Sequence, residues 1–246
     1  MGWKTGINEL MIIGGLFSLD SNKSFWGKAW EFVSRFTWQL PQTVLGSTYS
    51  NFSNWAWQVD RVEYWGGATV LSGNNWGQGS DVAVTIGSFI SGSNSLKSDP
   101  NNSIFQHEYG HYLQSQSMGW GYLTKVGIPS LLNALKKDDK HNLQPYEQDA
   151  NYRAFMYFNR NIPSFYQTGD EYVKNVGVKG WNFARNPLQI DKYIKVYRDY
   201  HDPNTIQKLK SLKITPSWYD YLAGPAILGA SGVAASIVLP LFGIPF

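Results

Sequence analysis

The sequence predicts a mostly helical α+β fold in which a small antiparallel sheet precedes a helix that carries two histidines. Three observations support this prediction. Apolar residues recur at helical spacing on both sides of the central part of the chain, residues 61–92 are rich in Gly, Ser, Thr, Val and aromatic residues, and HEYGH follows a turn sequence at residues 107–111. A chain of 246 residues is long enough for one large domain with a buried core.

The composition excludes several classes of protein. Hydrophobic residues make up 43% of the chain and charged residues 16%, which indicates a packed domain and not a disordered one. A net charge of +3 is too small for a nucleic-acid-binding surface, so no nucleic-acid partner is expected. Because the chain has no cysteine, any metal ligands must be His, Asp or Glu. The lack of cysteine fits the cytosol, secretion and the cell surface alike, so it leaves the compartment open.

Two helices are expected within residues 22–58, before the sheet. Trp26, Trp30 and Val33 fall on one stripe at helical spacing, which predicts a helix whose apolar face packs on the core. Pro41 ends or kinks this helix and suits the first position of the next one.

The sheet is expected within residues 61–92, as two to four antiparallel strands. Val82, Val84 and Ile86 alternate with smaller residues, which is the period of a half-buried strand. As an edge strand it could hold an extended peptide through main-chain hydrogen bonds. An ordinary interior strand is the alternative.

The helix that carries HEYGH is expected over residues 103–116, with Asn102 or Ser103 as its cap. Residues four apart lie on one helix face, so His107 and His111 can both bind one ion. Glu108 can then reach a water on that ion, which is the arrangement of a zinc hydrolase. The pattern therefore predicts a Zn²⁺ site with Glu108 as the general base. A helix with two structural histidines and a site without activity are the alternatives.

A third ligand is needed, because catalytic zinc usually has three protein ligands and one open position. The downstream candidates are Asp138, Asp139, His141, Glu147 and Asp149. Glu147 is preferred because it begins a helical segment in which the small Ala150 lets two helices approach. Asn151 shares the face of Glu147 and can orient a ligand through its amide oxygen. The alternative for Glu147 is a carboxylate that only favours the helix N-terminus.

Four further side chains have weaker assignments. Tyr146 and Tyr152 flank Glu147, and either could donate a hydrogen bond to the oxyanion of a reacting carbonyl. His141 is expected at the surface, with an oxyanion donor as the alternative. His201 is expected at the surface.

The residues after 215 form an apolar tail, with no charge from Leu222 to Phe246. Pro225 and Pro240 bracket about 21 Å of helix, which is shorter than the roughly 30 Å hydrocarbon core of a bilayer. The sequence therefore predicts a domain over residues 1–215, with active-site helices at 103–160, and a buried or partner-covered tail over 216–246. Membrane contact through this tail is the alternative.

Four segments carry a resemblance to a known family: SRFTWQLPQT, YWGGATVL, HEYGHYLQSQSMGWGYL and YEQDAN. Together they resemble the C-terminal region of some bacterial RHS/YD-repeat proteins of the polymorphic-toxin type, over about residues 22–158. The resemblance implies a zincin-like metallopeptidase domain and a role as a toxin or effector module. It implies gluzincin-like zinc binding by His107, His111 and Glu147, with Glu108 as the base. The chain departs from thermolysin-like gluzincins at Asn151, where they have Asp, and it lacks the YD repeats.

The predicted function is zinc-dependent hydrolysis of peptide bonds in a peptide or protein substrate. One alternative is a non-catalytic binding or structural module that uses the aromatic surface. The other is a membrane-acting effector that inserts the apolar tail.

Overall fold

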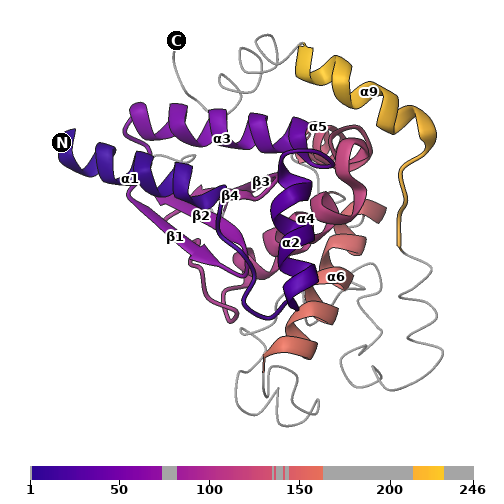
Figure 1. Ribbon diagram of the computed structural model, residues 1–246, viewed down its shortest axis with the longest axis horizontal. Coiled ribbons are helices and arrows are strands. Elements are labelled where there is room, and N and C mark those ends of the chain that lie inside the picture. Colours follow the sequence, from indigo (N-terminus) through magenta and orange to yellow (C-terminus); the bar gives the residue numbers. More distant parts are fainter. Residues whose placement is uncertain are drawn as a thin grey trace.

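A sheet with helices on both faces forms the body of the protein in the computed structural model, which describes residues 2–73, 82–134, 136, 141, 144–162 and 213–229 (Figure 1). Asp138, Asp139, His201 and the tail beyond Gly229 lie outside these residues. The helices are α1 (Gly2–Gly15), α2 (Phe25–Arg35), α3 (Leu40–Trp55), α4 (Ser103–Met118), α5 (Ile128–Ala134), α6 (Pro145–Asn161) and α9 (Trp218–Gly229). A 3₁₀ turn η1 (Gly119–Gly121) and a π-helical turn η2 (Leu123–Gly127) join α4 to α5.

The sheet is mixed, so the prediction of an antiparallel sheet is wrong for one pairing. The strands are β1 (Arg61–Trp65), β2 (Ala68–Gly73), β3 (Ala83–Ile86) and β4 (Phe89–Ser93), in the order β1-β2-β4-β3. Each hairpin is antiparallel, but β2 and β4 pair in parallel. Alternation within a strand indicates which face it buries and does not specify how two hairpins join.

β3 lies at the edge of the sheet formed by the described strands, as the edge-strand prediction requires. The first hairpin turns at Gly66 and Gly67, whose φ values of 54° and 81° suit a two-residue turn that glycine adopts without strain. The second hairpin turns at Gly87, with a φ of 66°. The Ser88 carbonyl in this turn accepts a hydrogen bond from the Thr69 amide at 2.8 Å, which joins the turn to β2.

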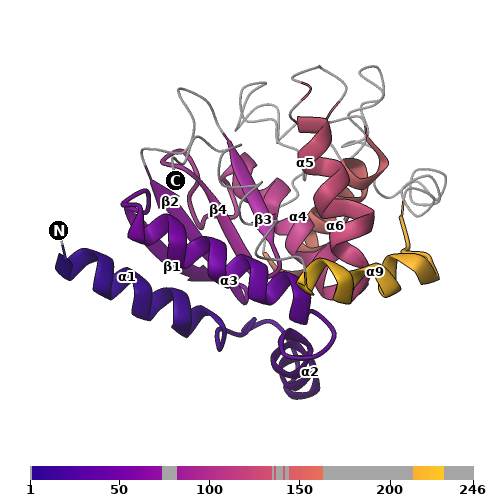
Figure 2. The same ribbon diagram turned by 90° about the horizontal axis from the view of Figure 1, so that it is seen from above.

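The helices bury two separate apolar clusters on the two sheet faces. Val70 and Ile90 point toward α4 and α6, where they join Phe105, Tyr109 and Phe158. On the other face, α1 and α3 cover Leu71 and Phe89, together with Ile12, Val59 and Val62. Figure 2 shows α1 and α3 on one side of the sheet and α4 and α6 on the other.

The boundaries of α4 follow from its end residues. The Asn102 side chain accepts a hydrogen bond from the Phe105 amide at 2.9 Å, which makes it the N-cap. Gly119, with a φ of 53°, ends the helix at its C-terminus. The helix therefore extends over the predicted residues and two beyond them.

α2 forms where it was predicted, but the prediction that its apolar stripe packs on the core is wrong. Trp26, Trp30 and Val33 are 78%, 58% and 47% exposed. Glu31, Ser34 and Arg35 are buried instead. The helix therefore presents its aromatic residues to the surface and its charged residues to the protein.

Hydrogen bonds explain this orientation of α2. Arg35 donates to the carbonyls of Gly15 at 3.1 Å and Gly67 at 2.5 Å. Glu31 accepts from the Asp20 amide and from Tyr112, and it pairs with Arg35 at 3.5 Å. A buried ion pair with this many partners is tolerated, whereas breaking it would leave a charge buried without compensation.

The residues after 212 pack against the turns that follow α4. Thr124 Oγ1 donates to the Asp220 carbonyl at 3.2 Å, and the rings of Trp38 and Tyr221 lie 5.4 Å apart. Among the residues that the structure describes, no helix is both long and apolar enough to cross a membrane. The first part of the predicted tail, as far as it is described, thus contacts η2 and the segment before α3.

α4 and α6 meet at Gly110, where a Cβ would overlap the backbone of Ala150. Glycine at position 110 therefore lets the Ala150 backbone approach α4 closely. We predict that Gly110→Ala lowers the free energy of unfolding by about 1–3 kcal/mol, since the added methyl forces the helices apart. Urea denaturation would measure this loss.

Gly6→Ala is the matched control, because a Cβ at Gly6 in α1 has no atom within 4 Å. This variant should stabilise the protein by about 0.5–1 kcal/mol, as expected for replacing glycine in a helix interior. Equal effects of the two substitutions would contradict the close helix contact.

Candidate metal centre

Three buried side chains converge between α4 and α6. Nε2 of His107 lies 3.0 Å and Nε2 of His111 lies 2.9 Å from Oε2 of Glu147. One ligand atom from each of the three residues lies within 4.8 Å of the other two, so the group could hold a metal ion. The structure thus brings Glu147 to the two histidines, as predicted for the third ligand.

The two helices position these side chains in different ways. α4 presents both histidines from one face, one turn apart. α6 begins with Pro145, which suits a first helical position, and Glu147 lies in its first turn. Because Gly110 lies between the two histidines in the sequence, the contact with Ala150 brings the start of α6 close to both imidazoles.

An amide oxygen holds each imidazole at its other nitrogen. Nδ1 of His107 lies 2.8 Å from Oδ1 of Asn151, and Nδ1 of His111 lies 2.7 Å from Oε1 of Gln114. An amide oxygen only accepts, so each Nδ1 carries the proton and each Nε2 is the nitrogen for a metal. The amide oxygen of Asn151 thus contacts a predicted ligand, as expected from its place on α6. Gln114 was not predicted, although its position three residues after His111 places it on the same helix face.

Asp149 is not one of the three converging side chains, but it contacts the Gln114 side chain that holds His111. Gln114 Nε2 donates to Oδ2 of Asp149 at 2.8 Å and to the Tyr146 carbonyl at 2.7 Å, which fixes the direction of the Gln114 amide. Arg153 pairs with the same Asp149 oxygen at 2.7 Å. The Asp149 carboxylate therefore contacts Gln114 and Arg153, and through Gln114 it orients His111.

The second oxygen of Glu147 has its own partners. Ser130 in α5 donates to Oε1 at 2.5 Å, and Nε2 of His141 lies 3.5 Å from the same atom. The His141 side chain is 26% exposed, so it is half-buried beside Glu147 and not fully at the surface as predicted. Ser130 was missed because nothing in its local sequence shows that α5 folds back over the start of α6.

The Glu108 carboxylate is held by the edge strand. Thr85 Oγ1 in β3 lies 2.6 Å from Oε2 of Glu108 and 3.0 Å from the Glu108 carbonyl. Tyr122 donates to the Thr85 carbonyl at 3.1 Å. Neither Thr85 nor Tyr122 carries a sequence signal for this role, since both contacts depend on the packing of β3 against α4.

The charges of the group suit a cation. Burial lowers the pKa of His111, but the Glu147 carboxylate outweighs burial and, with Glu108 and Gln114, raises the pKa to about 9. Burial raises the pKa of Glu147, but the charge of His111 and the hydrogen bonds from both histidines hold it well below its usual range. Glu147 is therefore ionised, and a bound metal ion would replace the proton on His111.

The tyrosines near His107, His111 and Glu147 have different surroundings. Tyr146 donates to the Pro129 carbonyl at 3.2 Å, and Tyr152 packs against the core cluster around Phe158. Burial, followed by the charges of Glu108 and Glu147, raises the pKa of Tyr122 well above 10. Tyr122 is therefore a neutral phenol close to Glu108, which the sequence did not indicate.

Comparisons of the chain with protein-family models, with curated proteins and with solved structures find no match. The arrangement of the side chains is therefore the basis for assigning a function.

We predict that Asn151→Leu weakens metal binding by about 10- to 100-fold, because His107 loses the acceptor that orients its ring. Titration with Zn²⁺ against a competing chelator would measure the affinity. Asn161→Leu, at the other end of α6, is the control and should bind metal as the unaltered protein does. Equal affinities for all three proteins would show that Asn151 does not orient a ligand.

Proposed function

We propose that the protein is a zinc-dependent metallopeptidase with a gluzincin-like site. One observation carries the proposal: Glu147 meets the imidazoles of His107 and His111 in a buried group, with Glu108 next to His107 on the same helix. Histidines that only stabilise the fold would need one hydrogen-bond partner each, and their imidazoles would not have to converge. Here both Nε2 atoms and a carboxylate oxygen point at one another, and amide oxygens hold both Nδ1 atoms.

The donor set fits zinc. Two imidazole nitrogens and one carboxylate oxygen are a common set of protein ligands for catalytic Zn²⁺, and they leave a position for water or substrate. When bound, the metal would polarise the scissile carbonyl and lower the pKa of the attacking water. Softer metals would favour thiolate ligands, and this chain has no cysteine.

Glu108 acts as the general base and then as the general acid. It takes a proton from the attacking water and passes it to the leaving amine. Thr85 holds Oε2 of Glu108, so Oε1 is the oxygen that receives the proton. Because Thr85 is in β3, the base is fixed relative to the strand that would bind the substrate.

A peptide suits the edge of β3. The Val82 carbonyl accepts from the Ser93 amide at 3.0 Å, so in this antiparallel pair the main-chain groups of Ala83 and Thr85 point away from β4. The Thr85 carbonyl already accepts a hydrogen bond from the Tyr122 hydroxyl. An extended substrate would pair with the main chain of Ala83 and the Thr85 amide, beside Glu108.

The biological role that we propose is that of a toxin or effector module acting on a peptide or protein. Its support is the resemblance of residues 22–158 to the C-terminal region of RHS/YD-repeat proteins. The site itself supports the chemistry and does not identify the target.

We expect Glu108→Gln to lower the rate of peptide cleavage by about 10²- to 10⁴-fold, because the amide cannot accept the proton from water. Zinc content should stay unchanged, since Glu108 is not a ligand. The measurement is cleavage of a mixed peptide library, followed by mass spectrometry, with the metal content of each protein determined in parallel.

Glu63→Gln is the matched control, because Glu63 lies in β1 and pairs with Arg61 at 3.1 Å. This variant should cleave as the unaltered protein does. Equal cleavage by the Glu108 variant would rule out the proposed mechanism. A lack of zinc in the unaltered protein, after dialysis against the metal, would rule out the site.

A further inference from the structure

The two oxygens of the Glu147 carboxylate have different surroundings. Oε2 faces both imidazoles, with Nε2 of His107 at 3.0 Å and Nε2 of His111 at 2.9 Å. Oε1 accepts a hydrogen bond from the Ser130 hydroxyl at 2.5 Å. Glu147 is 0% exposed, so its orientation is set by these protein groups. The carboxylate is therefore held with one oxygen toward the histidines and the other toward α5.

Ser130 is the group that fixes Oε1. Its distance from this oxygen is in the range of about 2.5–2.7 Å that is typical of a hydroxyl donating to an ionised carboxylate. Nε2 of His141 lies 3.5 Å from the same oxygen, which is longer than an ordinary N–H···O hydrogen bond. The hydrogen bond from Ser130 is therefore the stronger contact of Oε1.

Two successive residues of α5 are joined to two successive residues of α6. The Pro129 carbonyl accepts a hydrogen bond from Tyr146 at 3.2 Å, and Ser130 donates to Glu147. Figure 2 shows α5 beside α6. The backbone of α5 is thus fixed next to Ser130, which keeps the hydroxyl at the carboxylate.

The π-helical turn η2 affects which side of α5 faces α6. The Ile128 amide donates to the Leu123 carbonyl five residues earlier, whereas an α-helix pairs residues four apart. One additional residue in a helical turn rotates the side chains that follow it by about 100°. Ile128 and Leu132, on the side of α5 opposite Ser130, are 41% and 55% exposed. The turn therefore contributes to the direction of Ser130 toward Glu147.

We propose that Ser130 is a positioning residue that limits Glu147 to one metal-binding oxygen and so keeps a coordination position of the metal open. A carboxylate can bind a metal through one oxygen or through both. Oε2 and two imidazole nitrogens make three ligands, which leaves one position in a four-coordinate site. Without the Ser130 hydroxyl, Oε1 is free to turn toward the metal and fill that position.

This role of Ser130 rests on the metal binding of the proposed function and not on peptide cleavage. The open position is the one that water or a substrate carbonyl would use. Ser130 therefore acts through Glu147, and its effect is measurable without a substrate.

The test uses the full chain loaded with Co²⁺ in place of Zn²⁺, because Co²⁺ absorbs visible light and its spectrum depends on the ligands. Azide is the probe of the open position, and its binding is followed by the change in the spectrum. We expect Ser130→Ala to retain one Co²⁺ per chain but to bind azide at least about tenfold more weakly, because azide then competes with Oε1. Circular dichroism should show that the fold is unchanged.

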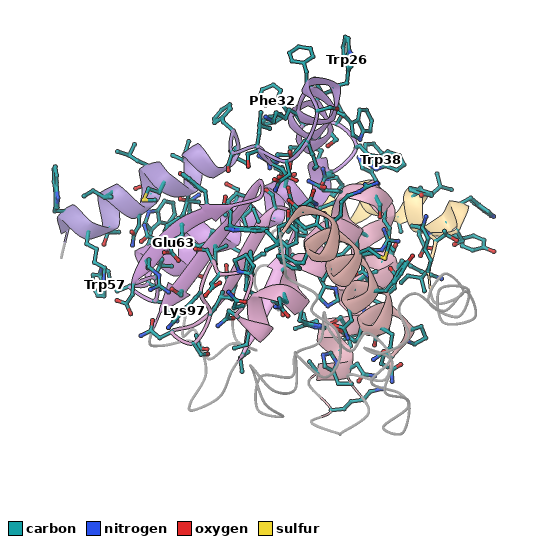
Figure 3. All side chains as sticks on the ribbon, turned by 90° about the horizontal axis from the view of Figure 1, so that it is seen from below. Trp26, Phe32, Trp38, Trp57, Glu63 and Lys97 are labelled. Atoms are coloured by element: carbon teal, nitrogen blue, oxygen red, sulfur yellow. The ribbon has the colours of Figure 1, made fainter. Side chains whose placement is uncertain are left out.

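Ser98→Ala is the matched control, because Ser98 also donates to a glutamate, at 2.9 Å from Oε2 of Glu63. Glu63 lies in β1, at the opposite edge of the described sheet from β3, and Figure 3 shows it on the opposite side of the molecule from the yellow helix α9. Ser130→Thr is the second control, because it keeps the hydroxyl. Both variants should bind azide as the unaltered protein does.

Four results would overturn the proposal. Equal azide binding by Ser130→Ala and the unaltered protein, with Co²⁺ bound to both, would show that Ser130 does not restrict Glu147, and the metal centre would stand. Loss of Co²⁺ from folded Ser130→Ala would make the hydroxyl necessary for metal binding itself. Weak azide binding by Ser130→Thr as well would assign the effect to packing. A lack of Co²⁺ and Zn²⁺ in the unaltered protein would remove the metal centre and the proposed function with it.

Discussion

The close contact of α4 and α6 at Gly110 and Ala150 is the constraint on which the site depends. Helices that carry larger side chains at a crossing lie 8–10 Å apart. Glycine at the crossing lets the Ala150 backbone approach α4 between His107 and His111, which brings Glu147 within hydrogen-bond distance of both imidazoles. A wider crossing would separate Glu147 from both imidazoles and Asn151 from His107. These buried polar groups would each lose a hydrogen-bond partner, so the stability of the helix packing and the geometry of the site depend on each other.

Local periodicity accounts for the part of the site that was predicted from the sequence. His107, Glu108 and His111 follow from spacing within one helix, and Glu147 with Asn151 follows from spacing within another. Thr85 and Ser130 could not be predicted, because β3 and α5 reach the site only through tertiary packing. The parallel pairing of β2 with β4 could not be predicted for the same reason, since alternation in each hairpin is equally compatible with other strand orders.

The orientation of α2 shows why apolar periodicity alone can fail. The stripe of Trp26, Trp30 and Val33 has the spacing of a core-facing helix, and the residues on the opposite side include Glu31 and Arg35. Periodicity assigns the apolar side to the core because burying a charge costs several kcal/mol. In this fold a carbonyl at the end of α1, a carbonyl in the first hairpin turn, an amide and a tyrosine hydroxyl offset that cost. These partners lie 11 to 81 residues from Glu31 or Arg35 in the chain.

The same buried network connects the surface of the protein to its centre. Tyr112 contacts Glu31 from α4, one residue after His111, so the helix that carries the histidines also fixes α2. The two sides of α4 therefore contact different parts of the protein. One side carries His107, Glu108 and His111, which contact α6 and β3. The other side contacts α2, whose aromatic residues face outward. Because a single helix carries both contacts, the orientation of α2 relative to the metal centre is set by α4 and not by a loop.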